Sequence, residues 1–143
     1  MTLSIEDRIR RLEDIEEVRQ LVTDYAALLD ARDMEAYADL FARDGAWIGP
    51  VVGAAHGREA ILALMRANLD PAPPGANHLV SNIVVAIDGD AGTARSRWTY
   101  VVPDAQGGPS LAISGRYDDR VVREDGRWRF AARTVSGDLP AIG

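Results

Sequence analysis

The sequence of 143 residues contains no cysteine and no lysine, because all 16 of its basic residues are arginine. Without cysteine, disulfides, thiolate nucleophiles, cysteine-ligated zinc and iron–sulfur clusters are excluded. Without lysine, a Schiff base and a covalently held pyridoxal phosphate are excluded as well. The two histidines, His56 and His78, are too few for a three-histidine metal site. Any chemistry must come from Asp, Glu, His, Tyr, Ser, Thr and Arg, and we expect no cofactor and no metal.

A basic surplus and a long apolar run are missing too. The formal net charge is −6, whereas nucleic-acid binding demands a basic face. No apolar run approaches the roughly 20 residues of a membrane span, and residues 1–11 are charged rather than typical of a signal peptide. We therefore expect a soluble cytoplasmic protein, a single domain over residues 1–143, whose partner is a small molecule rather than nucleic acid or membrane.

Apolar periodicity in the first half of the chain predicts three helices. Between Ile5 and Leu29 the apolar residues recur at steps of three and four, which indicates a long amphipathic helix with one buried stripe. Asp33 is the predicted N-cap of a second, shorter helix through Ala42. A short strand at Trp47-Ile48 separates it from a third helix over residues 59–69.

The second half of the sequence has the composition of strands. Four segments are rich in Val, Ile, Thr, Trp and Tyr and are separated by turn-forming residues. They span residues 79–87, 93–102, 110–122 and 128–135. Helices followed by an antiparallel meander predict an α+β fold with the helices on one face of a curved, mostly antiparallel sheet. Such a sheet can wrap a cone whose interior is a ligand pocket.

Two side chains near the end of the first predicted helix are candidates for chemistry. Asp30 follows the apolar pair Leu28-Leu29, where a carboxylate opposes the helix macrodipole at a cost of roughly 0.3–1 kcal/mol. A function would justify this position, and the alternative is a solvated helix end with Arg32 close by. Tyr25 lies more than one turn earlier, so that Tyr25 and Asp30 can face the same cavity from successive turns.

Histidine is the side chain best suited to proton abstraction near neutral pH. His78 begins the first long strand, and a nearby carboxylate would raise its proton affinity and fix its tautomer. The alternative is a hydrogen-bonded structural histidine. His56 precedes the third helix and is expected to be a surface strand residue.

Arg133 interrupts the last strand among small and apolar residues. Arginine is costly to bury there unless it is paired, so that it either faces solvent or meets an anion. Solvated charge explains the arginines around the last turn, which are Arg123, Arg127 and Arg129. Aromatic strand residues are usually core residues, but four of them suit the walls of a pocket: Trp47, Trp98, Tyr100 and Tyr117.

The order of the elements and a set of short motifs are similar to one known family over nearly the whole chain. The motifs are YAALLD at residues 25–30, FARDGAW at 41–47, GREAI at 57–61, NH at 77–78, and GRYD at 115–118 followed by REDGRWRF at 123–130. In this combination the chain resembles the SnoaL-like branch of the nuclear-transport-factor-2-like superfamily. The resemblance implies a cone-shaped α+β fold with three N-terminal helices that enclose a pocket.

Within that superfamily the sequence looks most similar to scytalone dehydratase, bile-acid 7α-dehydratase and hexachlorocyclohexane dehydrochlorinase. Those enzymes use an Asp at the end of the first helix and a His at the start of a strand, which match Asp30 and His78. The resemblance also matches a pocket tryptophan to Trp47, an active-site arginine to Arg133 and a dehydratase-type tyrosine to Tyr25.

Two features of the sequence depart from these enzymes. Scytalone dehydratase has a second histidine on the penultimate strand, roughly where this chain has Arg116. Only Ala141, Ile142 and Gly143 follow Pro140. A C-terminal cover over the pocket is therefore expected to be missing or supplied by a neighbouring subunit.

The resulting hypothesis is a cofactor-independent lyase that performs a dehydratase-type elimination on a hydrophobic, cyclic small molecule. His78 is the predicted general base, and Asp30 accepts a hydrogen bond from its other ring nitrogen. Tyr25 donates to a carbonyl or departing oxygen, and Arg133 stabilises developing negative charge or else anchors Asp30. One alternative is an isomerase or cyclase of the same superfamily. The other is a non-catalytic module that binds a small molecule or another protein.

Apolar walls and assembly complete this hypothesis. The walls that exclude water from the reaction are predicted to be Trp47, Trp98 and Tyr117. The sheet surface that faces away from the helices must be covered, and the resemblance implies that it is covered by a homo-oligomer. A trimer is favoured over a dimer, because the dehydratase-like relatives assemble as trimers.

Overall fold

The computed structural model describes residues 2–142, and within that range it contains three helices and seven strands. The elements are α1 Ile5–Ala31, α2 Met34–Asp39, β1 Phe41–Gly49, β2 Gly53–His56, α3 Arg58–Asn68, β3 Asn77–Asp88, β4 Ala91–Pro103, β5 Pro109–Glu124, β6 Arg127–Leu139 and β7 Ala141–Ile142. Each described helix is too short or too polar to traverse a bilayer.

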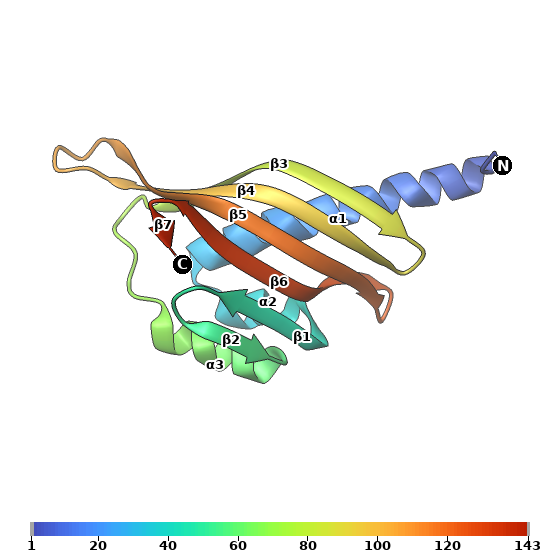
Figure 1. The fold of residues 1–143 in the computed structure, drawn as a ribbon, viewed down its shortest axis with the longest axis horizontal. Helices are drawn as coiled ribbons and strands as arrows, with labels where there is room; N and C mark the ends of the chain where they lie inside the picture. The colour runs from blue at the N-terminus through green and yellow to red at the C-terminus, as the bar shows by residue number, and fades with distance from the viewer. Residues whose placement is uncertain (1, 143) are drawn as a thin grey trace.

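The strands form one sheet in the order β2-β1-β6-β5-β4-β3, with β7 paired to β6. β1 and β6 run parallel, and the other pairs are antiparallel. Figure 1 shows α1 lying across one face of the curved sheet, with α3 beside β2. The predicted α+β fold with three helices and a mostly antiparallel sheet is confirmed.

The second predicted helix, which extends through Ala42, is longer than the helix in the structure. The helix ends at Asp39, and Phe41 and Ala42 begin β1 instead. Phe41 is in register with Phe130 of β6, and the Phe130 N–H donates to the Leu40 carbonyl at 2.9 Å. Pairing with the last strand therefore decides the local structure here, because helix propensity is a weak preference that tertiary contacts override.

Helix α1 begins at a Ser4 N-cap, whose hydroxyl accepts the Asp7 N–H at 3.0 Å, and ends at Arg32 in a left-handed conformation. The predicted single buried stripe is wrong for the N-terminal part of the helix. Ile5, Ile9 and Leu12 are at least half exposed, and Figure 1 shows the first turns of α1 projecting past the sheet. Burial begins at Asp14 and Val18.

The core between α1 and the sheet is largely aromatic. Tyr25 packs against Tyr37, Phe41 and Phe130, with ring centroids between 4.7 and 6.4 Å apart. Phe41 and Phe130 are themselves 5.3 Å apart, and all four rings are buried. Tilted and edge-on aromatic pairs of this kind add to the free energy that burial alone supplies. This cluster holds the C-terminal half of α1 against β1 and β6.

A buried carboxylate joins α1 to the β5–β6 turn. Asp14 accepts hydrogen bonds from Arg123 Nη2 at 2.6 Å and from Trp128 Nε1 at 3.0 Å. The Arg123 guanidinium also lies over the Trp128 ring. The expectation that the arginines around this turn are merely solvated is wrong for Arg123, and also for Arg129, which is 7% exposed.

We predict that Asp14→Asn destabilises the protein in a pH-dependent way. Burial raises the pKa of Asp14, but the hydrogen bonds from Trp128 and Arg123 outweigh it and hold the pKa below its ordinary value. Such a carboxylate contributes stability above its unfolded pKa, and this contribution is lost as the pH falls through the lowered folded pKa. The free energy of unfolding in urea should fall by roughly 1–3 kcal/mol at pH 7, and this deficit should vanish in strong acid.

The matched control is Asp88→Asn, which removes an exposed carboxylate at the end of β3. Its unfolding midpoint should equal that of the parent protein at every pH. A deficit for Asp14→Asn that stays constant down to pH 2 would contradict the assigned hydrogen bonds.

Candidate active site

The end of α1 and the start of β3 bring Asp30 and His78 together. His78 Nδ1 lies 2.6 Å from Asp30 Oδ1, and the His78 backbone N–H donates to Asp30 Oδ2 at 2.9 Å. The Asp30 side chain is 24% exposed and the His78 side chain is 15% exposed. Both carboxylate oxygens thus have a donor, which offsets the unfavourable position of a carboxylate at a helix C-terminus. The anticipated neighbour Arg32 instead donates to the carbonyls of Leu29 and Asp70.

This contact defines the free nitrogen of the imidazole. A carboxylate oxygen accepts hydrogen bonds, so that in the neutral ring Nδ1 carries the proton and Nε2 keeps its lone pair. Among residues 2–142, no hydrogen-bond partner is found for Nε2 of His78. The imidazole therefore offers a base at Nε2, and the carboxylate behind it can balance the charge that forms on protonation.

Aromatic rings surround the other side of the imidazole. His78 is stacked on Tyr100 with centroids 4.6 Å apart, and the Trp98 centroid lies at 6.2 Å. Trp98 in turn stacks on Tyr117 at 5.9 Å. Tyr100, Trp98 and His78 lie on the same face of the sheet, because His78 is in register with Tyr100 and strand residues alternate between faces. This is the face covered by α1, and we call it the inner face. Three of the aromatic residues singled out in the sequence therefore lie in one row beside the histidine.

Tyr25 lies deeper, under the end of α1. Its hydroxyl oxygen accepts hydrogen bonds from Tyr37 Oη at 2.6 Å and from Trp47 Nε1 at 2.9 Å. Burial raises the pKa of Tyr25, although the nearby Arg133 charge opposes this. The phenol therefore stays protonated at neutral pH, and with two donors on its oxygen it has its own hydrogen to give. Tyr37 is a member of this group that the sequence analysis did not select.

Two glycines make room for the tryptophans of the site. A Cβ on Gly49 would lie 2.2 Å from Cη2 of Trp47, and a Cβ on Gly115 would lie 2.7 Å from the Trp98 ring. Each indole therefore lies directly over a glycine. Trp98 Nε1 also donates to the Arg116 carbonyl at 3.2 Å. Bare backbone at these two positions fixes the orientation of both indoles.

We predict that Gly49→Ala displaces the Trp47 indole and weakens its hydrogen bond to Tyr25. Overpacking of this kind costs roughly 1–3 kcal/mol, measured as a lower free energy of unfolding. In the double variant Gly49→Ala/Trp47→Leu the new methyl group has space, so that the cost of the alanine should largely disappear. Strictly additive effects in this double-mutant cycle would contradict the packing of Trp47 on Gly49.

Arg133 is fully buried, and it is paired with an aspartate that the sequence analysis did not select. Its Nε and Nη2 donate to Oδ1 and Oδ2 of Asp119, both at 2.7 Å. The prediction that a buried Arg133 meets an anion is therefore confirmed, but its anchoring of Asp30 is wrong, because Asp119 occupies the guanidinium. Asp119 lies two residues after Tyr117 on the same face of β5, and this alternation is the one sequence feature that distinguishes it from the exposed Asp118.

Aromatic rings enclose the Arg133 guanidinium. Its Cζ lies 3.8 Å from the Tyr117 centroid, 4.2 Å from Tyr25 and 4.3 Å from Phe130. Burial lowers the pKa of Arg133, but the charge and hydrogen bonds of Asp119 raise it by more than burial lowers it. The pKa therefore lies above its ordinary value, and the guanidinium stays charged. Arg133 therefore contacts all three rings in the space between α1 and the sheet.

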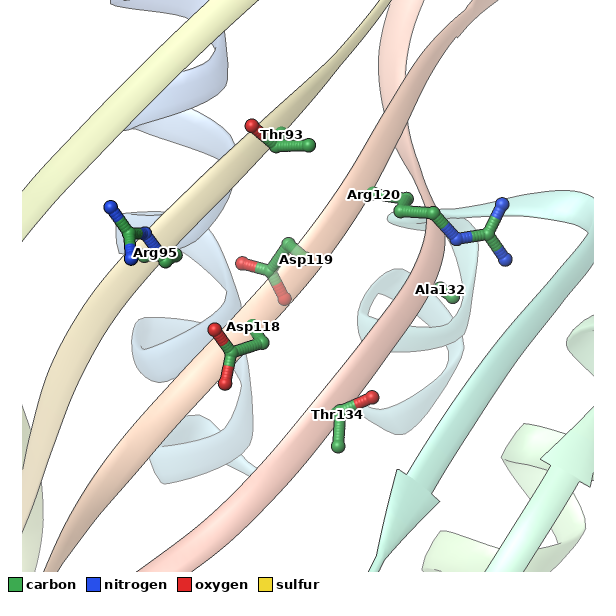
Figure 2. A pocket seen from close by; sticks show the side chains of 7 residues that line it. All are labelled: Thr93, Arg95, Asp118, Asp119, Arg120, Ala132 and Thr134. Carbon is green, nitrogen blue, oxygen red and sulfur yellow. The ribbon is translucent and has the colours of Figure 1, made fainter.

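A hollow of about 340 Å³ lies on the opposite face of the sheet, which we call the outer face. Figure 2 shows its lining residues, with Arg95 and Arg120 extending away from one another on either side of Asp118. It holds no histidine, and the helices lie behind the strands in this view. Over residues 2–142 there is no cluster of three or more acidic or histidine side chains that would hold a metal ion.

Comparison with known proteins places the chain in a family. The profile of the SnoaL-like domain matches residues 10–134. A search of curated protein sequences finds no match. An NTF2-like protein of cystatin-like fold from Novosphingobium aromaticivorans is 28% identical, with a TM-score of 0.80 over 92% of this chain and 86% of the other.

Two further solved structures show the same fold at lower identity. LinA is 22% identical, with a TM-score of 0.79 over 91% of this chain and 89% of its own. A Novosphingobium aromaticivorans protein that is assigned as a scytalone dehydratase is 24% identical, with a TM-score of 0.72 over 89% of this chain and 85% of its own. The fold is therefore one that carries different proteins, and the site has to supply the function.

Proposed function

The chain belongs to the SnoaL-like family, and we propose that within it the protein is a cofactor-independent lyase, which eliminates water from a hydrophobic cyclic small molecule with His78 as the general base. The observation that carries this proposal is the 2.6 Å contact between His78 Nδ1 and Asp30 Oδ1, with Nε2 free. A container for a ligand has no need of a base held by a carboxylate. A protein of the same fold is assigned as a scytalone dehydratase, so that this fold is compatible with the proposed reaction class.

The proposed reaction begins at Nε2 of His78. This nitrogen takes a proton from carbon, the C–H electron pair forms the new double bond, and the bond to the leaving oxygen breaks. The leaving hydroxide takes up the proton that His78 removed and departs as water, which restores the neutral imidazole. Asp30 fixes the tautomer and balances the imidazolium charge in between.

The remaining side chains shape the environment of this reaction. Tyr25 donates a hydrogen bond to the departing or carbonyl oxygen, and its hydroxyl is polarised by Trp47 Nε1. Arg133 stacks on the Tyr25 ring and favours negative charge on that hydroxyl. Trp98 and Tyr117 form apolar walls that exclude water and so strengthen the electrostatic interactions inside.

We predict a graded loss of activity when these residues are changed. A panel of hydroxy-ketones, steroids and chlorinated cycloalkanes is incubated with the protein, and products are identified by mass spectrometry. For a substrate found in this way, His78→Ala should lower kcat/KM by at least about 10²-fold, because general bases contribute about 10²–10⁴-fold. Asp30→Asn should also cause a large loss, since its amide N–H can turn the imidazole into the wrong tautomer. Tyr25→Phe should cost less.

The matched control is His56→Ala, which removes the other histidine at the exposed end of β2 and should leave kcat/KM unchanged. Circular dichroism verifies that each variant is folded. A product with the mass of the substrate would identify an isomerase instead. Turnover by His78→Ala at more than about a tenth of the parent rate would show that the base lies elsewhere.

We further propose that the outer face of the sheet is covered by a second copy of the chain. Arg95, Asp118 and Arg120 project from this face, and none of them has an ion-pair partner within 4.0 Å in the described range. Charges of both signs lie side by side there, because Arg95 is in register with Asp118. In a closed ring, Asp118 of one subunit can meet an arginine of the next.

We predict that the protein is a trimer, with a mass by light scattering near three times that of the 15.5 kDa chain. Asp118→Arg places like charges across the interface and should shift the protein toward the monomer, most strongly at low salt. Glu16→Arg on the exposed side of α1 changes the net charge equally and should not alter the mass. A native protein that is monomeric at micromolar concentration would refute this assembly.

A further inference from the structure

The first turns of α1 bury none of their side chains. All of residues 2–13 are exposed, and burial begins at Asp14, because this part of the helix projects past the sheet (Figure 1). Three of the exposed side chains are nevertheless large and apolar, since Ile5, Ile9 and Leu12 are 68%, 50% and 66% exposed. We call these three residues the projecting stripe. A helix end that stays in water is expected to be polar all round, so that the stripe indicates a partner.

The projecting stripe lies on the side of α1 that faces away from the sheet. Its members are spaced by four and three residues and therefore follow one line along the helix. Val18 and Tyr25, which are buried, lie about half a turn from this line. Farther along the same side, α1 carries Glu16, Gln20 and Thr23, which are exposed and polar. The apolar surface is thus confined to the part of α1 that projects, and it is separate from both faces of the sheet.

Charges of opposite sign flank the projecting stripe on its two sides. Arg8 lies on one side, and Glu6 and Glu13 lie on the other. Arg8 and Glu13 are exposed, and neither has an ion-pair partner within 4.0 Å in the described part of the chain. In the notation of coiled coils the stripe occupies positions d, a and d, Arg8 occupies position g, and both glutamates occupy position e. This is the charge pattern of a helix that pairs with another helix.

The flanking charges select the partner and its orientation. When two copies of the helix pair in parallel, position g of each copy faces the following position e of the other. Arg8 of each copy then meets Glu13 of the other, whereas in an antiparallel pair the glutamates would face one another. An anionic lipid surface is disfavoured, because acidic residues outnumber arginines five to three between residues 5 and 16. A second copy of the chain therefore fits the stripe.

We propose that the projecting stripe is an interface at which two copies of the chain pair through α1, side by side and in parallel. This contact is independent of the outer face of the sheet and of the proposed elimination. Three apolar side chains per copy bury less surface than a standard interface does, so that the pairing is weak. It is therefore populated at higher protein concentration than the proposed assembly through the outer face.

Disulfide cross-linking tests the pairing, because the chain has no cysteine and each introduced thiol is unique. In a parallel pair, each residue at position d faces its own counterpart within reach of a disulfide. Ile5→Cys and Leu12→Cys should therefore each give a covalent dimer under mild oxidation, seen on a non-reducing gel. Val51→Cys is the matched control and should stay monomeric on the gel. Val51 is also apolar, and it is 76% exposed in the turn between β1 and β2.

A charge reversal tests the orientation. In the Leu12→Cys protein, Arg8→Glu should slow dimer formation by about fivefold or more at low salt, since two surface ion pairs become two like-charge contacts. Adding Glu13→Arg should restore the rate, because the ion pairs then form again with exchanged signs. Arg11→Glu makes the same change of charge away from the seam and should leave the rate unchanged. Circular dichroism verifies that each variant is folded.

Three outcomes would overturn this interface. Cross-linking of Ile5→Cys and Leu12→Cys no faster than that of Val51→Cys would show that a second copy does not cover the stripe. Cross-linking of Ile9→Cys alone would show an antiparallel pair, because only the central residue then faces its counterpart. Cross-linking should persist in the Asp118→Arg background, and its loss there would show that the contact depends on the outer face. None of these measurements uses catalysis, so that failure of the lyase and failure of the interface are distinguishable.

Discussion

The ion pair between Arg133 and Asp119 is the interaction on which the interior of the protein depends. A fully buried guanidinium is tolerated only with its charge paired, and here both carboxylate oxygens bind it at 2.7 Å. Three aromatic rings, from Tyr25, Tyr117 and Phe130, lie within 4.3 Å of its Cζ. Cation–π attraction is stronger where water is excluded. One side chain thus ties α1 to the last two long strands.

A chain of direct contacts connects this ion pair to the candidate catalytic residues and fixes their positions. Tyr25 stacks on Arg133, and its hydroxyl holds the indole of Trp47 by a hydrogen bond. Tyr117 stacks against Trp98, and Trp98 lies beside His78. The base therefore rests on a packed row of rings and not on a free loop. Preorganisation of this kind is what lets fixed dipoles and charges act on a reaction without rearranging.

Much of the fold follows from periodicity, and part of the site follows from residue type. The long helix and the four long strands accord with local spacing in the sequence. The pairing of Asp30 with His78 joins residues 48 positions apart, and the resemblance to the family, not local spacing, implies it. The sequence pattern predicts a helix at Phe41, because the parallel pairing of Phe41 with Phe130 is a contact over 89 positions that no local window contains. Periodicity does not reveal the exposed start of α1, because it records amphipathicity and not whether a partner surface reaches that far.

Asp119 shows most clearly why the rest of the site could not be read from the sequence. An aspartate in the run Tyr117-Asp118-Asp119-Arg120 is typical of an exposed strand, and only the alternation of faces separates Asp119 from Asp118. Burial of Asp119 raises its pKa, and the Arg133 charge opposes this shift, so that each partner makes the other tolerable inside the protein. Neither residue signals the pair alone. The functional assignment of Arg133 changes with it, because an arginine whose charge is balanced donates hydrogen bonds but exerts little net field on a substrate. The developing charge of the proposed elimination therefore falls to Tyr25 and to the Asp30–His78 pair.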